Sequence, residues 1–89
     1  MNIFDCLKEI ITEKKGGLSD HSDFSKIWSN YMIVRYLSMD PRFFQVSVIA
    51  NRLQTTLSNK DMYLFLVKNT PYSKNSYIRY ITKPKNSEI

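Results

Sequence analysis

The first apolar residues of the chain recur every three to four positions, which is the period of an amphipathic helix. They predict a helix over residues 2–14, with Asn2 as its N-cap. Gly16 and Gly17 follow it, and glycine tolerates the left-handed conformation that ends many helices, so we expect the helix to stop there. The apolar stripe consists of Ile3, Phe4, Leu7, Ile10 and Ile11.

Residues 16–22 are rich in turn-forming residues and predict a flexible connection. A second helix is expected to begin near Ser22 or Ser25 and to end near Leu37. Apolar residues cover it on all sides, which indicates a helix at the centre of its domain or one covered by another chain. The pattern places Phe24, Ile27, Trp28, Tyr31, Val34 and Arg35 on one side, and Met32, Ile33, Tyr36 and Leu37 on the others.

Asp40 and Pro41 predict the start of a third helix. Asp40 is a suitable N-cap, and Pro41 suits the first helical position because the N–H that proline lacks has no partner there. The helix is expected to extend to about Gln54. Its inward positions are predicted to be Val46, Ile49, Ala50 and Leu53.

The apolar run over residues 62–67 is compatible with a buried strand or a helix, because the period of so short a run does not separate the two. Ser58 and Asp61 stand three residues apart, as in a capping box, and this favours a helix. Pro71 is expected to end it, since proline interrupts helical hydrogen bonding.

A last short helix is predicted over residues 73–82, followed by a frayed tail at residues 84–89. The predicted fold class is therefore all-α, with a single small domain of four to five short helices in residues 1–83. The inward positions of the last helix are expected to be Tyr77, Ile78 and Ile81.

Charge is distributed unevenly along the chain. The net charge is +5, yet residues 1–20 hold three lysines and four acids, while residues 62–89 hold five basic residues and one acid. A basic C-terminal end indicates an anionic partner, most often nucleic acid. No apolar stretch approaches the length of about 18 residues that a membrane-spanning helix needs, so no membrane span is expected.

Catalytic and metal-binding patterns are not found in the sequence. A single histidine, His21, and a single cysteine, Cys6, are too few for a zinc site, and no glycine-rich phosphate loop occurs. Glu9 and Glu13 are one helical turn apart, but a solvated helix face explains them better than a catalytic pair. We therefore expect a non-catalytic protein without cofactors; the lone cysteine fits a reducing cytoplasm. The N-terminus lacks the pattern of a signal peptide.

The C-terminal segment interleaves basic and aromatic side chains, which suits nucleic acid. Lysine and arginine neutralise phosphates, and tyrosine hydrogen-bonds the backbone or stacks on unpaired bases. The alternative is that the aromatic residues anchor the core while the charges face solvent. The candidate DNA-binding residues are Lys74, Tyr77, Arg79, Tyr80, Lys83 and Lys85.

Residues 28–41, WSNYMIVRYLSMDP, resemble the signature of the bacteriophage clamp-loader A subunit, the small non-ATPase subunit of T4-like phage clamp loaders. Other segments of the chain resemble family segments and occur in the same order. The N-terminal stretch resembles the family's first helix, and it is followed by the segments VIANRL, LSNKDMYLFLVKNTP and YIRYITKPK. Val34 departs from the pattern, because a polar residue, often asparagine, usually precedes the arginine. The matching positions are Trp28, Ser29, Tyr31, Met32, Ile33, Arg35, Leu37, Ser38 and Pro41.

This resemblance implies a role in DNA replication in the cytoplasm of an infected bacterium. In the family, the A subunit joins four AAA+ ATPase subunits in an assembly that opens a sliding clamp and places it on primer–template DNA. The subunit supplies no ATP chemistry and bridges ATPase, clamp and DNA. The residues that the resemblance singles out, for partner binding or as part of its signature, are Trp28, Tyr31, Met32, Arg35 and Ser38, although aromatic residues such as Trp28 and Tyr31 are more often core residues.

Two other functions fit the same composition. One is a small phage protein that binds and inhibits a host enzyme or defence complex. The other is a helix-turn-helix regulator, although residues 42–53 offer few polar side chains to read base edges. Arg35 lies in the most apolar stretch of the chain, so we expect its guanidinium to meet an acidic or carbonyl-rich group, either within the chain or on a partner. On that basis Arg35 is interpreted as a structural pin of the Ser38–Pro41 turn rather than a DNA contact.

Overall fold

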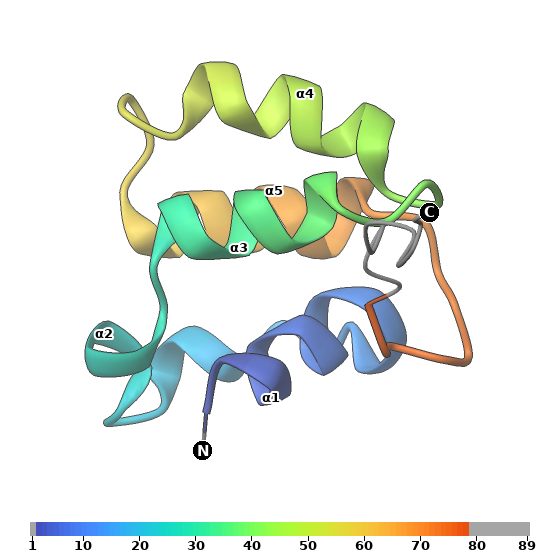
Figure 1. Cartoon of the computed structure of the whole chain (residues 1–89). Coiled ribbons are helices and arrows are strands. Elements are labelled where there is room, and N and C mark those ends of the chain that lie inside the picture. The colour runs from blue at the N-terminus through green and yellow to red at the C-terminus, as the bar shows by residue number, and fades with distance from the viewer. Residues whose placement is uncertain (1, 79–89) are drawn as a thin grey trace, which may run out of the picture.

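The all-α prediction is confirmed. The computed structural model describes residues 2–78, and within them the chain forms five α-helices, one π-helix and one 3-10 helix without any β-strand (Figure 1). The elements are α1 (Ile3–Lys8), the π-helix η1 (Glu9–Glu13), the 3-10 helix η2 (Leu18–Asp20), α2 (Phe24–Ile27), α3 (Asn30–Ser38), α4 (Phe44–Leu53) and α5 (Asn59–Asn69).

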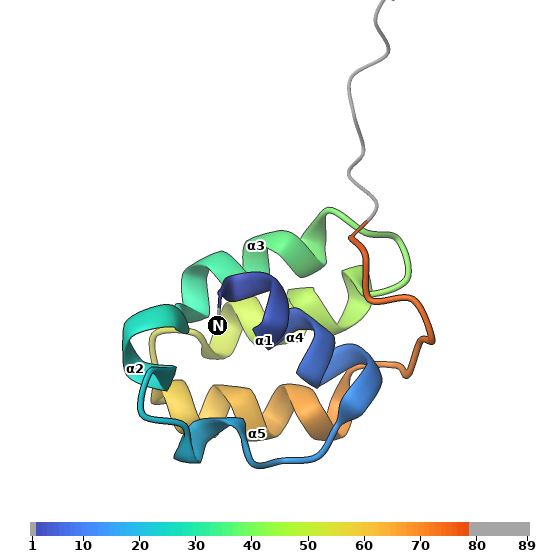
Figure 2. The same ribbon diagram turned by 90° about the horizontal axis from the view of Figure 1, so that it is seen from below.

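The helices are arranged in three layers. In the view of Figure 1, α3 and α5 lie in the middle layer, with α1 and η1 below them and α4 above. Figure 2 shows that α3 and α5 lie on opposite sides of the molecule, and α4 packs against both of them while η1 packs against α5. The core lies between these layers, where apolar faces of α1, η1, α3 and α5 meet. Its buried apolar residues are Cys6, Leu7, Ile10, Ile11, Phe24, Trp28, Ile33, Val34, Leu37, Phe43, Val46, Ala50, Met62, Tyr63, Leu66 and Ile78.

The first helix begins where the sequence predicts. The Asn2 side chain accepts hydrogen bonds from the backbone N–H groups of Phe4 and Asp5, and the Asp5 carboxylate accepts one from the Asn2 N–H at 2.8 Å. This reciprocal capping box satisfies otherwise unpaired donors. The helical segment ends at Glu13, close to the expected end, but the left-handed residue that caps it is Lys14 (φ 52°), and Gly16, which also has a positive φ of 84°, lies two residues farther on. Phe4 is also exposed rather than inward.

The predicted second helix is divided in two. Trp28 has an extended backbone after α2, and Ser29 caps α3 by accepting a hydrogen bond from the Met32 N–H at 3.3 Å. The indole N–H of Trp28 donates to the Asn30 side chain at 2.6 Å, which holds the break. The expectation that this helix is buried on all sides within its own domain is wrong, since Tyr31 and Arg35 are exposed, whereas its coverage by another chain stays a prediction.

The start of α4 differs from the prediction as well. Asp40 is fully buried and does not cap α4, which begins only at Phe44. Its carboxylate accepts hydrogen bonds from the backbone and guanidinium of Arg42, including one from Nη2 at 2.8 Å. Residues 41–43 form a turn between this pair and the helix. Of the four predicted inward positions, Val46, Ala50 and Leu53 are at least partly buried, whereas Ile49 is 52% exposed.

Helix α5 follows the prediction closely. The Ser58 hydroxyl oxygen accepts a hydrogen bond from the Asp61 N–H at 3.1 Å, and the helix ends at Asn69, before Pro71. Residues 71–78 form an irregular, extended segment that we call the strap, so the helix predicted over residues 73–82 is wrong for residues 73–78. Ile78 is buried as expected, but Tyr77 is 68% exposed. Residues 79–82, with Ile81, lie outside the described residues.

The strap is held from two sides. On η1, the Thr12 hydroxyl donates to the Ser73 carbonyl at 2.7 Å, and the Ser73 N–H donates to the Ile11 carbonyl at 3.2 Å. From the α3–α4 connection, Arg42 donates to the Ser73 hydroxyl at 2.7 Å and to the carbonyls of Asn75 and Tyr77 at 2.7 and 2.8 Å. Arg42 therefore joins the buried carboxylate of Asp40 to the last described part of the chain.

A polar network joins the N-terminal layer to α5. Glu9 is buried, so its assignment to a solvated face is wrong: its carboxylate accepts from the Tyr63 hydroxyl at 2.6 Å and from the Gly16 N–H at 2.7 Å. The Tyr63 oxygen also accepts from the Leu18 N–H at 3.0 Å. Burial, together with the hydrogen bond to Glu9, raises the pKa of the Tyr63 hydroxyl above its ordinary value, which keeps this donor protonated.

Lys14 forms a second polar contact between the N-terminal layer and α5, at the C-terminus of α5. Its ammonium group donates to the carbonyls of Val67 and Thr70, at 2.8 and 2.5 Å. The last carbonyls of a helix lack intrahelical partners, so a lysine there satisfies them and complements the helix dipole. Burial lowers the pKa of the Lys14 amine, partly offset by the nearby Glu9 carboxylate.

Candidate partner-binding surface

An open groove of about 350 Å³ lies between α3 and α4. The residues of α3 that line it are spaced at i, i+3, i+4 and i+7, which places them on one face of the helix. From α4, residues one turn apart form the opposite wall. The lining residues are Tyr31, Val34, Arg35 and Ser38 from α3, and Phe44, Ser47, Val48, Asn51 and Gln54 from α4 and its end.

Arg35 is at the edge of this groove with its charge in solvent. Its Nη1 donates to the hydroxyl of Tyr31, one helical turn earlier, at 3.3 Å. No carboxylate in residues 2–78 forms an ion pair with it. The Ser38 hydroxyl donates to the Arg35 backbone carbonyl at 2.6 Å, so it contacts the helix backbone and not the guanidinium. The expectation that Arg35 pins the following turn is therefore wrong.

The outer side of α4 exposes apolar side chains. Phe44 is 53% exposed, Ile49 52% and Val48 40%. Tyr31, on the neighbouring α3, is also exposed. Single exposed apolar residues are ordinary, but a contiguous group marks an interaction surface. We call this group, together with Arg35, the α4 face.

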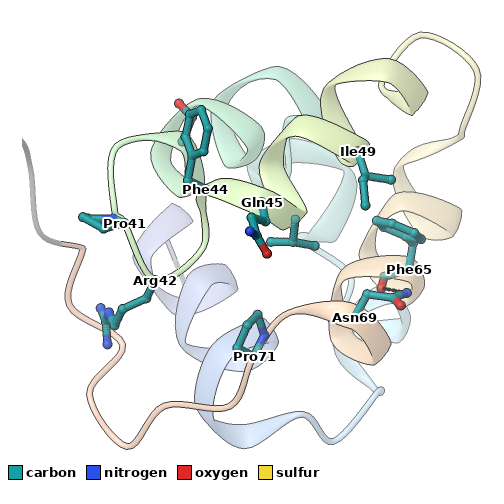
Figure 3. Close-up of a pocket in the computed structure, with 10 residues that line it drawn as sticks. Pro41, Arg42, Phe44, Gln45, Ile49, Phe65, Asn69 and Pro71 are labelled. Carbon is teal, nitrogen blue, oxygen red and sulfur yellow. Dashed lines mark hydrogen bonds between the residues drawn. The ribbon is translucent and has the colours of Figure 1, made fainter.

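A second groove, of about 680 Å³, lies on the other side of α4 against α5 (Figure 3). Ile49 and Phe65 lie close together at one end, Pro41 and Arg42 lie at the other, and Pro71 lies between them (Figure 3). Phe44 and Ser38 contribute to both grooves. The exposed part of α4 thus forms a ridge between the two grooves, and another protein can contact it on both sides.

The structure brings three of the five predicted partner-binding residues together. Tyr31, Arg35 and Ser38 line the α3–α4 groove. Met32 is half-buried and does not line it. Trp28 is buried in the core, where its ring stacks on Phe24 at 5.4 Å between centroids, so its position in the signature is that of a core residue.

The predicted DNA-binding residues are described only in part. Lys74 and Tyr77 are exposed on the strap, where both are accessible to a ligand. They do not belong to a helical basic face, since the strap is extended. Arg79, Tyr80, Lys83 and Lys85 lie outside the described residues, so the basic-aromatic segment stays a prediction.

Groups with chemical reactivity are few in residues 2–78. No cluster of three His, Cys, Asp or Glu side chains that could hold a metal occurs in this range. Cys6 is buried, and burial raises the pKa of its thiol to about 11, which disfavours the reactive thiolate. His21 is exposed, and its Nδ1 accepts from the Asp23 N–H at 3.1 Å. None of the helices in this range is long and apolar enough to cross a membrane.

Sequence reasoning missed Phe44 and Val48. A signal was present: α4 carries apolar residues at positions 44, 46, 48, 49, 50 and 53, which is more than one inward stripe can hold. Some of them had to be exposed or covered by another molecule.

Comparison of the chain with protein-family models, curated proteins and solved structures found no match in any of the three.

Proposed function

We propose that this chain is a non-catalytic accessory subunit of a phage DNA-replication clamp loader and that it docks onto its protein partners through the α4 face. The observation that carries the proposal is the position of Tyr31, Arg35 and Ser38. These three residues of the clamp-loader-like signature line one groove, beside the exposed apolar residues of α4. By resemblance, the partners are AAA+ clamp-loader ATPase subunits, the sliding clamp and primer–template DNA.

The chemistry of the groove supports binding rather than catalysis. Among residues 2–78, Arg35 and Tyr31 are the only ionisable residues that line it. Neither a general base nor a nucleophile with a neighbouring base lines the groove. Exposed aromatic residues with arginine are, by contrast, the composition enriched at the centres of protein interfaces.

The partner assignment is tested by mixing the purified chain with the AAA+ clamp-loader ATPase and the sliding clamp encoded in the same genome. We expect one complex in size-exclusion chromatography. Tyr31→Ala is expected to weaken it about tenfold in calorimetry, as truncation of an interface aromatic residue commonly does. Tyr72→Ala is the matched control, because Tyr72 is 65% exposed on the strap, outside the α4 face.

Two results would contradict this assignment. One is that neither the ATPase nor the clamp co-elutes with the chain. The other is that a pull-down from infected cells recovers a host enzyme or defence complex in their place, which would support the inhibitor function instead.

The DNA contact is tested separately. Binding to a fluorescent primer–template duplex is expected to weaken steeply with salt, because contacts to phosphates release counterions. Replacing Arg79 and Lys83 by alanine should weaken binding for all sequences alike, whereas replacing the exposed Lys8 and Lys15 should not. Binding that is unchanged between low and high salt would remove DNA from the list of partners.

A further inference from the structure

The two helices that form the α3–α4 groove carry no acidic residue. Their charged residues are Arg35 on α3 and Arg52 on α4. The nearest acid in the sequence, Asp40 in the connection, is fully buried and bonded to Arg42. Nothing on these two helices therefore neutralises the exposed guanidinium of Arg35, and the groove presents a positive charge to its surroundings.

Apolar side chains flank this charge. Tyr31 lies one turn before Arg35, and Val34 lies beside it. Phe44 and Val48 form the facing wall from α4 and are about half exposed. A ligand that enters the groove thus meets one cation between apolar surfaces, with the amide of Asn51 as a further polar group.

We propose that the α3–α4 groove binds a segment of a partner protein in which a single carboxylate is flanked by apolar side chains. The carboxylate accepts hydrogen bonds from the Arg35 guanidinium, which suits the forked geometry of arginine. The flanking side chains pack on Tyr31, Phe44 and Val48. This inference deepens the proposed function and rests on it for the use of the site, since it specifies what the groove recognises in the docked protein.

Nucleic acid fits this groove less well than a peptide. Sites that follow a phosphate backbone place several cations along a groove. Of the described residues, Arg35 is the one cation that lines the groove, and Arg52 on α4 lies outside it.

A second copy of the chain is also a poorer occupant. Asp5 stands next to the exposed Phe4, as an acid beside an apolar residue should, but its carboxylate already caps α1 through the Asn2 N–H. Docking through Asp5 would break that cap. Self-association remains measurable as a change in elution volume with concentration, and it would contradict the proposal if Arg35→Gln abolished it.

The test is a selection of displayed random 12-residue peptides on the immobilised full chain. We expect enriched peptides to share one Asp or Glu between apolar residues. In fluorescence anisotropy, replacing that acid by its amide should weaken binding about tenfold, the loss typical of a charge-assisted hydrogen-bond pair. With the Arg35→Gln chain, the acid and amide peptides should bind equally.

Arg52→Gln is the matched control, because Arg52 is an exposed arginine on α4 that does not line the groove. It should keep the preference for the acid peptide. Arg35 is exposed, so circular dichroism and the melting temperature of Arg35→Gln should match those of the unchanged chain, which shows that any loss is local.

Three results would overturn the inference: no enrichment of peptides, enrichment without a shared acid, or an acid preference that survives Arg35→Gln. These outcomes are separable from failure of the proposed function. If the ATPase and clamp bind while the acid preference is absent, the inference alone fails. If the acid preference is present while the ATPase and clamp do not bind, the proposed function alone fails.

Discussion

The side of α5 that faces the N-terminal layer and the outer side of α4 are built in opposite ways. Between η1 and α5, buried apolar residues are accompanied by polar contacts: Glu9 accepts a hydrogen bond from Tyr63, and Lys14 donates to backbone carbonyls at the end of α5. On the outer side of α4, apolar residues such as Ile49 remain exposed. The polar groups between η1 and α5 find their hydrogen-bond partners within the chain, whereas the outer side of α4 has the composition of a protein interface.

This difference separates stability from function in a small domain. A chain of 89 residues buries a modest core and has little stability in reserve. Apolar residues left in solvent contribute little to that stability, so we infer that they serve contact with another molecule. Substitutions on the two sides should consequently differ sharply in their effect on the free energy of unfolding.

The same substitution on each side gives the largest contrast. Ile10→Ala should lower the free energy of unfolding by about 3–4 kcal/mol, because Ile10 is fully buried and its removal leaves a cavity. Ile49→Ala should lower it by less than about 1 kcal/mol, since half of this side chain is already in water. Urea denaturation of both variants measures the difference. Equal losses would show that α4 packs more tightly than its exposure indicates.

Arg42→Ala should lower the free energy of unfolding by about 2–3 kcal/mol, although Arg42 is itself partly exposed. It leaves the carboxylate of Asp40 buried without its ion-pair partner, and it frees the strap at Ser73, Asn75 and Tyr77. Hydrogen exchange should accelerate at the N–H of Ser73. Arg35→Ala, an arginine of the α4 face, is the control and should change stability by less than about 0.5 kcal/mol. An equal effect of both variants would refute the role of Arg42.

Tyr63→Phe should lower the free energy of unfolding by about 1–2 kcal/mol. The change removes the hydroxyl that donates to Glu9 and accepts from the Leu18 N–H, and both groups then lose a buried partner. Tyr31→Phe removes an exposed hydroxyl and should be close to neutral. Thermal unfolding followed by circular dichroism compares the two, and a neutral Tyr63→Phe would mean that water replaces the hydroxyl.

Alkaline pH should weaken the N-terminal layer by a smaller amount. Burial raises the pKa of the Cys6 thiol from about 9 to about 11, so above pH 9 the unfolded chain loses this proton while the folded chain keeps it. The unfolded state then binds fewer protons, and the free energy of unfolding falls by about 1 kcal/mol between pH 9 and pH 10. Denaturation curves at the two pH values test this. Cys6→Ala should remove this part of the slope.

Local signals in the sequence predicted much of the fold. The caps at Asn2 and Ser58 are short-range hydrogen bonds between residues two or three apart, and both occur as predicted. The break at Trp28 was missed because an apolar period continues through it, while the Ser29 cap and the indole bond to Asn30 interrupt the helix. The spacing of apolar residues alone does not reveal a side-chain cap that interrupts the helix.

Long-range contacts could not be predicted in this way. Glu9 and Tyr63 are 54 positions apart, and Arg42 and Tyr77 are 35 apart, so no local spacing pairs them. The candidate site was predicted in part: Tyr31, Arg35 and Ser38 share a helix face whose spacing is visible in the sequence. Phe44 and Val48 join them only because α4 packs antiparallel to α3, which is a property of the tertiary fold.

Arg42 anchors the strap, and this anchor limits how far from Ile78 the residues that follow can reach. It binds the strap partly through the backbone carbonyls of Asn75 and Tyr77, which every amino acid possesses, so the anchor tolerates changes of side chain at both positions. The next residue, Ile78, is buried, so the described part of the chain ends at a fixed point of the core. The seven positions from 79 to 85 span at most about 25 Å when fully extended. A ligand that contacts Arg79, Lys83 or Lys85 would therefore lie within about that distance of Ile78, plus the length of one side chain.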